Sequence, residues 1–181
     1  MSMTVIEHEE LASDQSSIIL STIAGDYTDL LIVLSLRSSR AAANNDYVAM
    51  KFNASTSNYS SRLLIGNGAS ASSGTDVSFS APRIIADIPA STSTASTFGS
   101  MQIYIPNYAG SSAKSVSVDA VTENNGTTAF QEITAFLWDD TTAITDITFE
   151  ALAGGTNNFK QYSSVTLYGI TAGSDGTTTV S

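Results

Sequence analysis

The clearest pattern along the chain is an alternation of apolar and polar residues with a period of two. It is strongest in residues 29–37, where Leu30, Ile32, Leu34 and Leu36 share one face. The opposite face changes from apolar to polar as the segment runs out. Alternation with this period predicts a β-strand, and an entirely apolar face predicts a central place in a sandwich.

Nine further segments have strand-like composition or alternation. They are residues 16–23, 47–53, 61–65, 77–88, 98–105, 114–123, 131–138, 143–151 and 163–170. Apolar residues that share a face are, segment by segment, Val48, Met50 and Phe52; Ile84, Ala86 and Ile88; Val116, Val118 and Ala120; Ile133, Ala135 and Leu137; Ile147 and Phe149. Turn signals separate the segments by roughly 8–15 residues, as in sandwiches and barrels. We therefore predict an all-β protein, a jelly-roll-like antiparallel β-sandwich of about ten strands with no substantial helix.

The predicted organisation is one domain with short extensions. Residues 1–15 are expected to be an N-terminal strand or arm, residues 16–171 a single sandwich domain, and residues 172–181 a polar tail. The small polar stretches 69–76 and 90–97 are expected to be loops. In the closing strand, Gly169 stands among bulky residues, which suggests a bulge or a close approach of another group to the backbone.

Charge narrows the possible partners. The chain has 17 acidic and 7 basic residues, a net charge of −10, and no cluster of Lys and Arg. Nucleic acid is therefore not an expected partner, because phosphate contacts need positive charge. A basic protein partner remains compatible with an acidic surface. There is no cysteine, no secretory signal pattern at the N-terminus and no apolar run long enough to span a membrane, so we expect no membrane association.

No set of residues with catalytic spacing stands out. His8 is the only histidine and lies in the N-terminal segment, a poor place for the base of a catalytic triad. The acidic groups at residues 7–10 and 139–140 lack the spacing of a calcium loop and are expected to be solvated. We therefore predict that the protein is not an enzyme and uses no cofactor or metal. The tyrosines Tyr59, Tyr104 and Tyr108 lie at strand ends or turns, and with Asn107 they are the predicted protein-interface residues.

Several segments, taken in order, resemble a family of tailed-bacteriophage virion proteins. The matching segments are residues 23–31, Phe52-Asn53, Tyr59-Ser60, Phe98-Gly99, residues 103–108, residues 144–147, Phe159 and residues 166–170. Their order and spacing fit over most of residues 20–170, whereas the polar loops 69–76 and 90–97 carry no family feature. The family consists of small jelly-roll proteins that decorate or cement capsids, with related domains in tail appendages.

The resemblance implies a virion structural protein at the capsid surface that is assembled in the host cytoplasm. As a decoration or cement protein, it would bind between subunits of the major capsid protein and stabilise the head, with a homotrimer as the expected state. The alternative is a tail-appendage or tail-fibre domain that binds carbohydrate on the host surface. The resemblance implies no catalytic residues.

Overall fold

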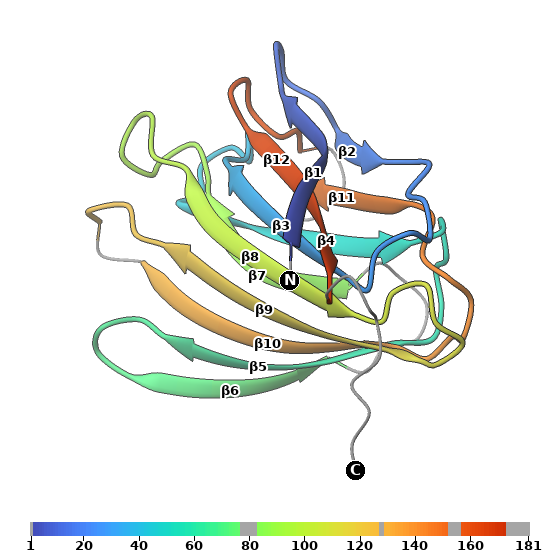
Figure 1. Cartoon of the computed structure of the whole chain (residues 1–181). Helices are drawn as coiled ribbons and strands as arrows, with labels where there is room; N and C mark the ends of the chain where they lie inside the picture. Colours follow the sequence, from blue (N-terminus) through green and yellow to red (C-terminus); the bar gives the residue numbers. More distant parts are fainter. Residues whose placement is uncertain (1, 77–82, 127–128, 152–156, 173–181) are drawn as a thin grey trace.

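The computed structural model describes residues 2–76, 83–126, 129–151 and 157–172. Within these ranges the chain forms twelve β-strands and no helix (Figure 1). The strands are β1 (Ser2–Glu10), β2 (Ser17–Leu20), β3 (Asp29–Leu36), β4 (Asn45–Phe52), β5 (Tyr59–Gly66), β6 (Ala71–Asp76), β7 (Arg83–Pro89), β8 (Gly99–Pro106), β9 (Lys114–Thr122), β10 (Phe130–Trp138), β11 (Ile147–Ala151) and β12 (Ser164–Thr171).

These strands form two sheets that pack against each other as a sandwich. The larger sheet has the order β1-β12-β3-β8-β9-β10-β5-β6, and the smaller has the order β2-β11-β4-β7. Every pairing within them is antiparallel. The predicted all-β sandwich is therefore confirmed, with twelve strands where about ten were expected. A jelly roll has eight strands, so that finer topology stays a prediction.

The core follows the alternation seen in the sequence. In β3, Leu30, Ile32, Leu34 and Leu36 are all buried, and the strand lies between β12 and β8 in the larger sheet. The predicted apolar faces that are likewise buried comprise Val48, Met50, Phe52, Ala86, Ile88, Val116, Val118, Ala120, Ile147 and Phe149. Full burial of one such aliphatic or aromatic side chain contributes about 1.5–3 kcal/mol to folding. Residues 77–82 of one predicted segment lie outside the described residues.

β10 buries the opposite face from the one that carries its aliphatic residues. Its inward residues are Glu132, Thr134, Phe136 and Trp138, while Ile133, Ala135 and Leu137 point outward. Phe136 and Trp138 pack on Phe52 of the smaller sheet, with ring centroids 5.9 and 5.6 Å apart. Since a strand buries only one of its two faces, burial of these two large rings forces the aliphatic residues outward.

The predicted ends and loops also differ from the structure in part. Residues 2–10 form β1, an edge strand with a bulge between Val5 and Glu7, so the N-terminal segment is a strand of the larger sheet. Residues 69–76 were expected to be a loop, but they contain β6, which pairs with β5. Ser and Gly have little β-propensity, so pairing with a neighbouring strand decides this segment. Of the predicted polar tail, residues 173–181 lie outside the described residues.

The loop at residues 90–97 is held in place by the side chain of Arg37. The guanidinium of Arg37 donates hydrogen bonds of 2.8–3.2 Å to the carbonyl oxygens of Ala90, Ser93, Thr94 and Thr97. Such charge-assisted bonds satisfy backbone carbonyls that no strand partner reaches. This buried cation therefore helps to fix the shape of the polar loop, together with backbone hydrogen bonds to residues 40–44.

The closing strand β12 packs as its sequence suggested. Val165 and Leu167 face the core and are fully buried. Gly169 lies under the ring of Tyr27, and a Cβ added at this glycine would lie 2.3 Å from the ring atom Cγ. The expectation of a close approach at Gly169 is confirmed, and the group that approaches is an aromatic ring.

Candidate interaction surface

The larger sheet turns one face toward the smaller sheet and one face outward, and the outward face carries apolar side chains. A first group lies on β1, β12, β3 and β8, and we call it the β1–β8 patch; it comprises Met3, Val5, Leu31, Val33, Tyr104, Tyr168 and Ile170. Strand register places Val5 opposite Tyr168, Tyr168 opposite Leu31, and Leu31 opposite Tyr104. A continuous apolar row across four strands differs from single exposed apolar residues, which are common on any surface.

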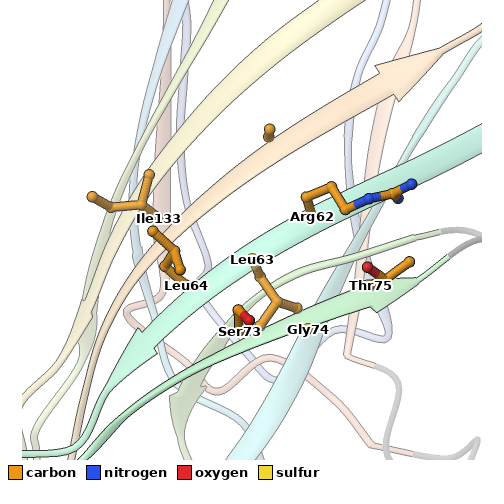
Figure 2. A pocket seen from close by; sticks show the side chains of 8 residues that line it. Arg62, Leu63, Leu64, Ser73, Gly74, Thr75 and Ile133 are labelled. Carbon is orange, nitrogen blue, oxygen red and sulfur yellow. The ribbon is translucent and has the colours of Figure 1, made fainter.

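A second apolar group lies on the same outward face, toward the β6 edge, and surrounds a shallow pocket of about 320 Å³ (Figure 2). Leu64 of β5 and Ile133 of β10 oppose each other there and are 59% and 53% exposed. The side chain of Arg62 lies across the pocket from them. We call this the β5–β10 pocket. Its chemistry suits an apolar side chain of a partner with an acidic group beside it.

Two of the four predicted interface residues lie on the surface. The Tyr104 hydroxyl donates a 2.8 Å hydrogen bond to Oδ2 of Asp29, and the backbone N–H of Asn107 donates a 2.9 Å bond to Oδ1 of the same carboxylate. The bond to Asp29 raises the pKa of Tyr104. Asn107 has a φ of 49°, a left-handed conformation that asparagine tolerates better than most residues. Their predicted role in an interface stays a prediction.

The other two predicted interface residues, Tyr59 and Tyr108, are buried, so the prediction that they contact a partner is wrong. The hydroxyl of Tyr59 accepts a 2.8 Å bond from the backbone N–H of Phe52, which ties the two sheets together. The hydroxyl of Tyr108 donates to the carbonyl oxygen of Ala24 and accepts from the N–H of Tyr27. Tyrosine at a strand end is amphipathic, so it is equally suited to packing its ring inside and bonding its hydroxyl to a turn.

The most perturbed ionisable groups lie between the sheets. Glu132 of β10 and Asp87 of β7 are both buried and share a hydrogen bond between their carboxyl groups. The backbone N–H of Asp87 also donates a 2.6 Å bond to Oε2 of Glu132. Burial, and then the charge of Asp87, raises the pKa of Glu132 from 4.5 to about 8. Glu132 is therefore the protonated partner, and it donates to the Asp87 carboxylate.

Sequence reasoning missed this carboxyl pair. Glu132 alternates with Thr134, Phe136 and Trp138, and the two aromatic rings were the signal that this face is the buried one. Asn45 donates its side-chain N–H to Asp87, and Thr122 donates its hydroxyl to the Asp87 carbonyl oxygen at 2.6 Å, so both are structural partners.

His8, the only histidine of the chain, lies on β1. His8 is exposed, and its Nδ1 lies 2.8 Å from the hydroxyl oxygen of Thr166. Within the described ranges, no three side chains capable of binding a metal lie together. The same part of the chain holds no helix suited to crossing a membrane.

The positive charges of the chain are mostly used within the fold. Lys114 and Arg37 are buried, and the two described ion pairs are Lys51–Glu150 and Lys160–Asp14, each with an N–O distance of 2.6 Å. The surface is therefore dominated by acidic groups, as the net charge of −10 requires. A surface of this kind attracts basic partners over about one Debye length, ~8 Å at physiological salt.

Comparison with protein-family models, with curated proteins and with solved structures finds no match. The function must therefore be inferred from features of the chain itself. They are an open sheet face with two apolar groups and an acidic surface. Contiguous exposed apolar patches are a feature that marks interaction sites in many proteins.

Proposed function

We propose that this chain is a structural protein of a tailed-bacteriophage virion. In this proposal it decorates the capsid, binds between subunits of the major capsid protein and stabilises the head. The observation that carries the binding role is the continuous apolar row from Val5 to Tyr104 on the open face of the larger sheet. The ordered resemblance over residues 20–170 supports the virion setting.

The outward face has the features that such a contact needs. A stable protein interface covers about 800 Å² of each partner, with an apolar centre and a polar rim. The β1–β8 patch and the β5–β10 pocket supply two apolar centres on one sheet, and Ser117 and Asp119 of β9 lie between them. The acidic surface favours a basic surface on the partner, so binding is expected to weaken as salt is raised.

The homotrimeric state and the virion location belong to the same proposal. They rest on the resemblance to decoration proteins, which occupy repeated positions on a capsid. A binding protein of this type clamps neighbouring subunits by adding interface area, and it needs no reactive group.

The test is a binding assay with capsids that lack the decoration layer. Wild-type protein should cosediment with them and raise their thermal stability. Ile133→Asp places a charge on the proposed surface and should weaken binding about tenfold or more. Ile19→Asp is the matched control, because Ile19 on β2 of the smaller sheet is also 53% exposed and should tolerate the same change.

A second variant, Val5→Asp, tests the β1–β8 patch separately. Failure of the wild-type protein to bind or stabilise the capsids would remove the decoration role. Normal binding by both Ile133→Asp and Val5→Asp would show that the open sheet face is not the contact surface.

A further inference from the structure

A separate hollow of about 310 Å³ lies near the start of β12. Four segments build it: Asp14, which follows β1; Arg37, which follows β3; Ser96 and Phe98, which precede β8; and residues 160–162, which precede β12. It lies within the size range of small-molecule sites, and it combines apolar rings with a few polar groups as such sites do. The two apolar groups on the outward sheet face share none of its lining residues.

The turn that forms one wall is firmly fixed. Each backbone N–H from residue 160 to residue 163 donates a hydrogen bond. The bonds are Lys160 to the Arg37 carbonyl at 2.8 Å, Gln161 to Oδ1 of Asp14 at 2.9 Å, Tyr162 to the Leu11 carbonyl at 2.9 Å, and Ser163 to the Lys160 carbonyl at 3.0 Å. The side chains on this turn are therefore presented in a set geometry.

Tyr162 stands out on that turn. Its φ is 72°, a left-handed conformation that is rare for a bulky residue, and its side chain is 61% exposed to solvent. Across the hollow, Ser96 is also left-handed, with a φ of 62°. Strained backbone of this kind persists where the surrounding structure enforces it, and it clusters at ligand sites. The fold thus keeps the ring of Tyr162 exposed to solvent, although Asn or Gly would adopt this left-handed backbone conformation more easily.

The lining groups match one class of ligand. The rings of Tyr162 and Phe98 provide apolar faces, whereas the Gln161 amide and the Ser96 hydroxyl provide hydrogen-bonding groups. The ammonium of Lys160 is bonded to Asp14 at 2.6 Å, and the guanidinium of Arg37 is bonded to carbonyl oxygens of the 90–97 loop, so both cations of the lining already have partners. A sugar ring has apolar C–H faces and a rim of neutral hydroxyls, and this combination complements both features.

We infer that this hollow binds a neutral saccharide, with the ring of Tyr162 stacked on the sugar. Binding of sugar is a further activity, and it does not depend on the capsid role proposed above. The Asp14–Lys160 pair and the Gln161 amide then bond to the sugar hydroxyls. A phosphate or other anion is disfavoured, because Asp14 neutralises the lysine, and the Arg37 guanidinium is already bonded to carbonyl oxygens of the 90–97 loop.

The experiment is saturation-transfer NMR of the full chain with glucose, galactose, mannose, rhamnose and N-acetylglucosamine. Each sugar is used at about 10 mM, because small sites of this kind bind in the millimolar range. At least one sugar should receive saturation on its ring protons. The backbone amide signals of Gln161 and Ser96 should shift on titration, a readout that needs no variant.

Variants then locate the site. Tyr162→Asn should weaken binding about tenfold or more with the fold intact, because asparagine accepts the left-handed conformation. Tyr162→Phe should retain binding, since the ring remains, and Tyr104→Asn on the open sheet face is the matched control that should bind like the wild type.

Saturation of none of the five sugars, or wild-type affinity in Tyr162→Asn, would overturn the inference. Shifts confined to other parts of the chain, or binding of phosphate in place of sugar, would also overturn it. The two proposals fail separately, because Tyr162→Asn leaves the open sheet face intact, and Ile133→Asp leaves the hollow intact.

Discussion

The buried pair of carboxyl groups between the sheets predicts how stability changes with pH. Glu132 lies on the larger sheet and Asp87 on the smaller, so the two groups and the sheets they belong to are held together by one shared proton. Asp46 lies near enough to oppose a second negative charge, while Arg40 offsets it in part. Replacement of Glu132 by Gln keeps the shape and an N–H donor but removes the titration.

The direction in which stability changes with pH follows from the two pKa values of Glu132. In the unfolded chain the pKa is near its ordinary 4.5, and in the folded protein it is about 8. Below pH 4.5 both states are protonated, so the contribution of Glu132 to stability is most favourable there. Between these values the unfolded chain loses the proton first, and folding is weakened by about 1.4 kcal/mol per pH unit. The total reaches about 5 kcal/mol near pH 8, which is an upper limit because relaxation of the sheets relieves part of the cost. Above pH 8 the total stays constant, because both states are then deprotonated.

The measurement is urea denaturation of wild type and Glu132→Gln at half-unit steps from pH 4 to 9. The two proteins should have similar stability near pH 4.5, and the variant should gain stability relative to wild type up to pH 8. Glu10→Gln, the same change at an exposed position of β1, is the control and should follow the wild-type curve. Parallel curves for wild type and Glu132→Gln across this range would refute the shared-proton arrangement.

Two other substitutions test the packing of β12. Gly169→Ala should destabilise the protein by about 1–3 kcal/mol in urea denaturation, because the new Cβ would lie 2.3 Å from the Tyr27 ring; unchanged stability would mean that the ring moves aside freely. Leu167→Asp should prevent folding, because it places an unpaired charge at a fully buried position. A folded, soluble Leu167→Asp protein in circular dichroism would contradict the central place of this strand.

Local pattern was sufficient for most of the strands. In β3 the alternation, the β-branched residues and the flanking turn residues all favour the same structure, so the strand and its buried face follow from the residues alone. The same holds for the residues of β4 and β9 that were predicted to face inward, all of which are buried. The close approach at Gly169 was also visible in the sequence, because a residue without a side chain is out of place in a bulky strand.

The candidate sites were much less accessible to such reasoning. Tyr104 and Tyr108 have similar local settings, yet one lies on the open face and the other in the core. The local sequence pattern does not indicate whether another segment of the chain will cover a tyrosine side chain. Tyr162 was not among the predicted interface residues, since its exposure depends on a turn fixed by hydrogen bonds from Gln161 to Asp14 and from Tyr162 to Leu11, far away in the sequence.

The sequence by itself determined the fold class, the positions of most strands and the acidic character of the surface, because these depend on neighbouring residues and on composition. Tertiary structure decided which face of β10 is buried, since both faces carry apolar residues and only contact with Phe52 favours the aromatic one. Tertiary structure also made the small, polar segment 71–76 an edge strand. It placed Glu132 next to Asp87 as well. Those outcomes depend on the partner that long-range packing provides, and the residues of one strand do not encode that partner.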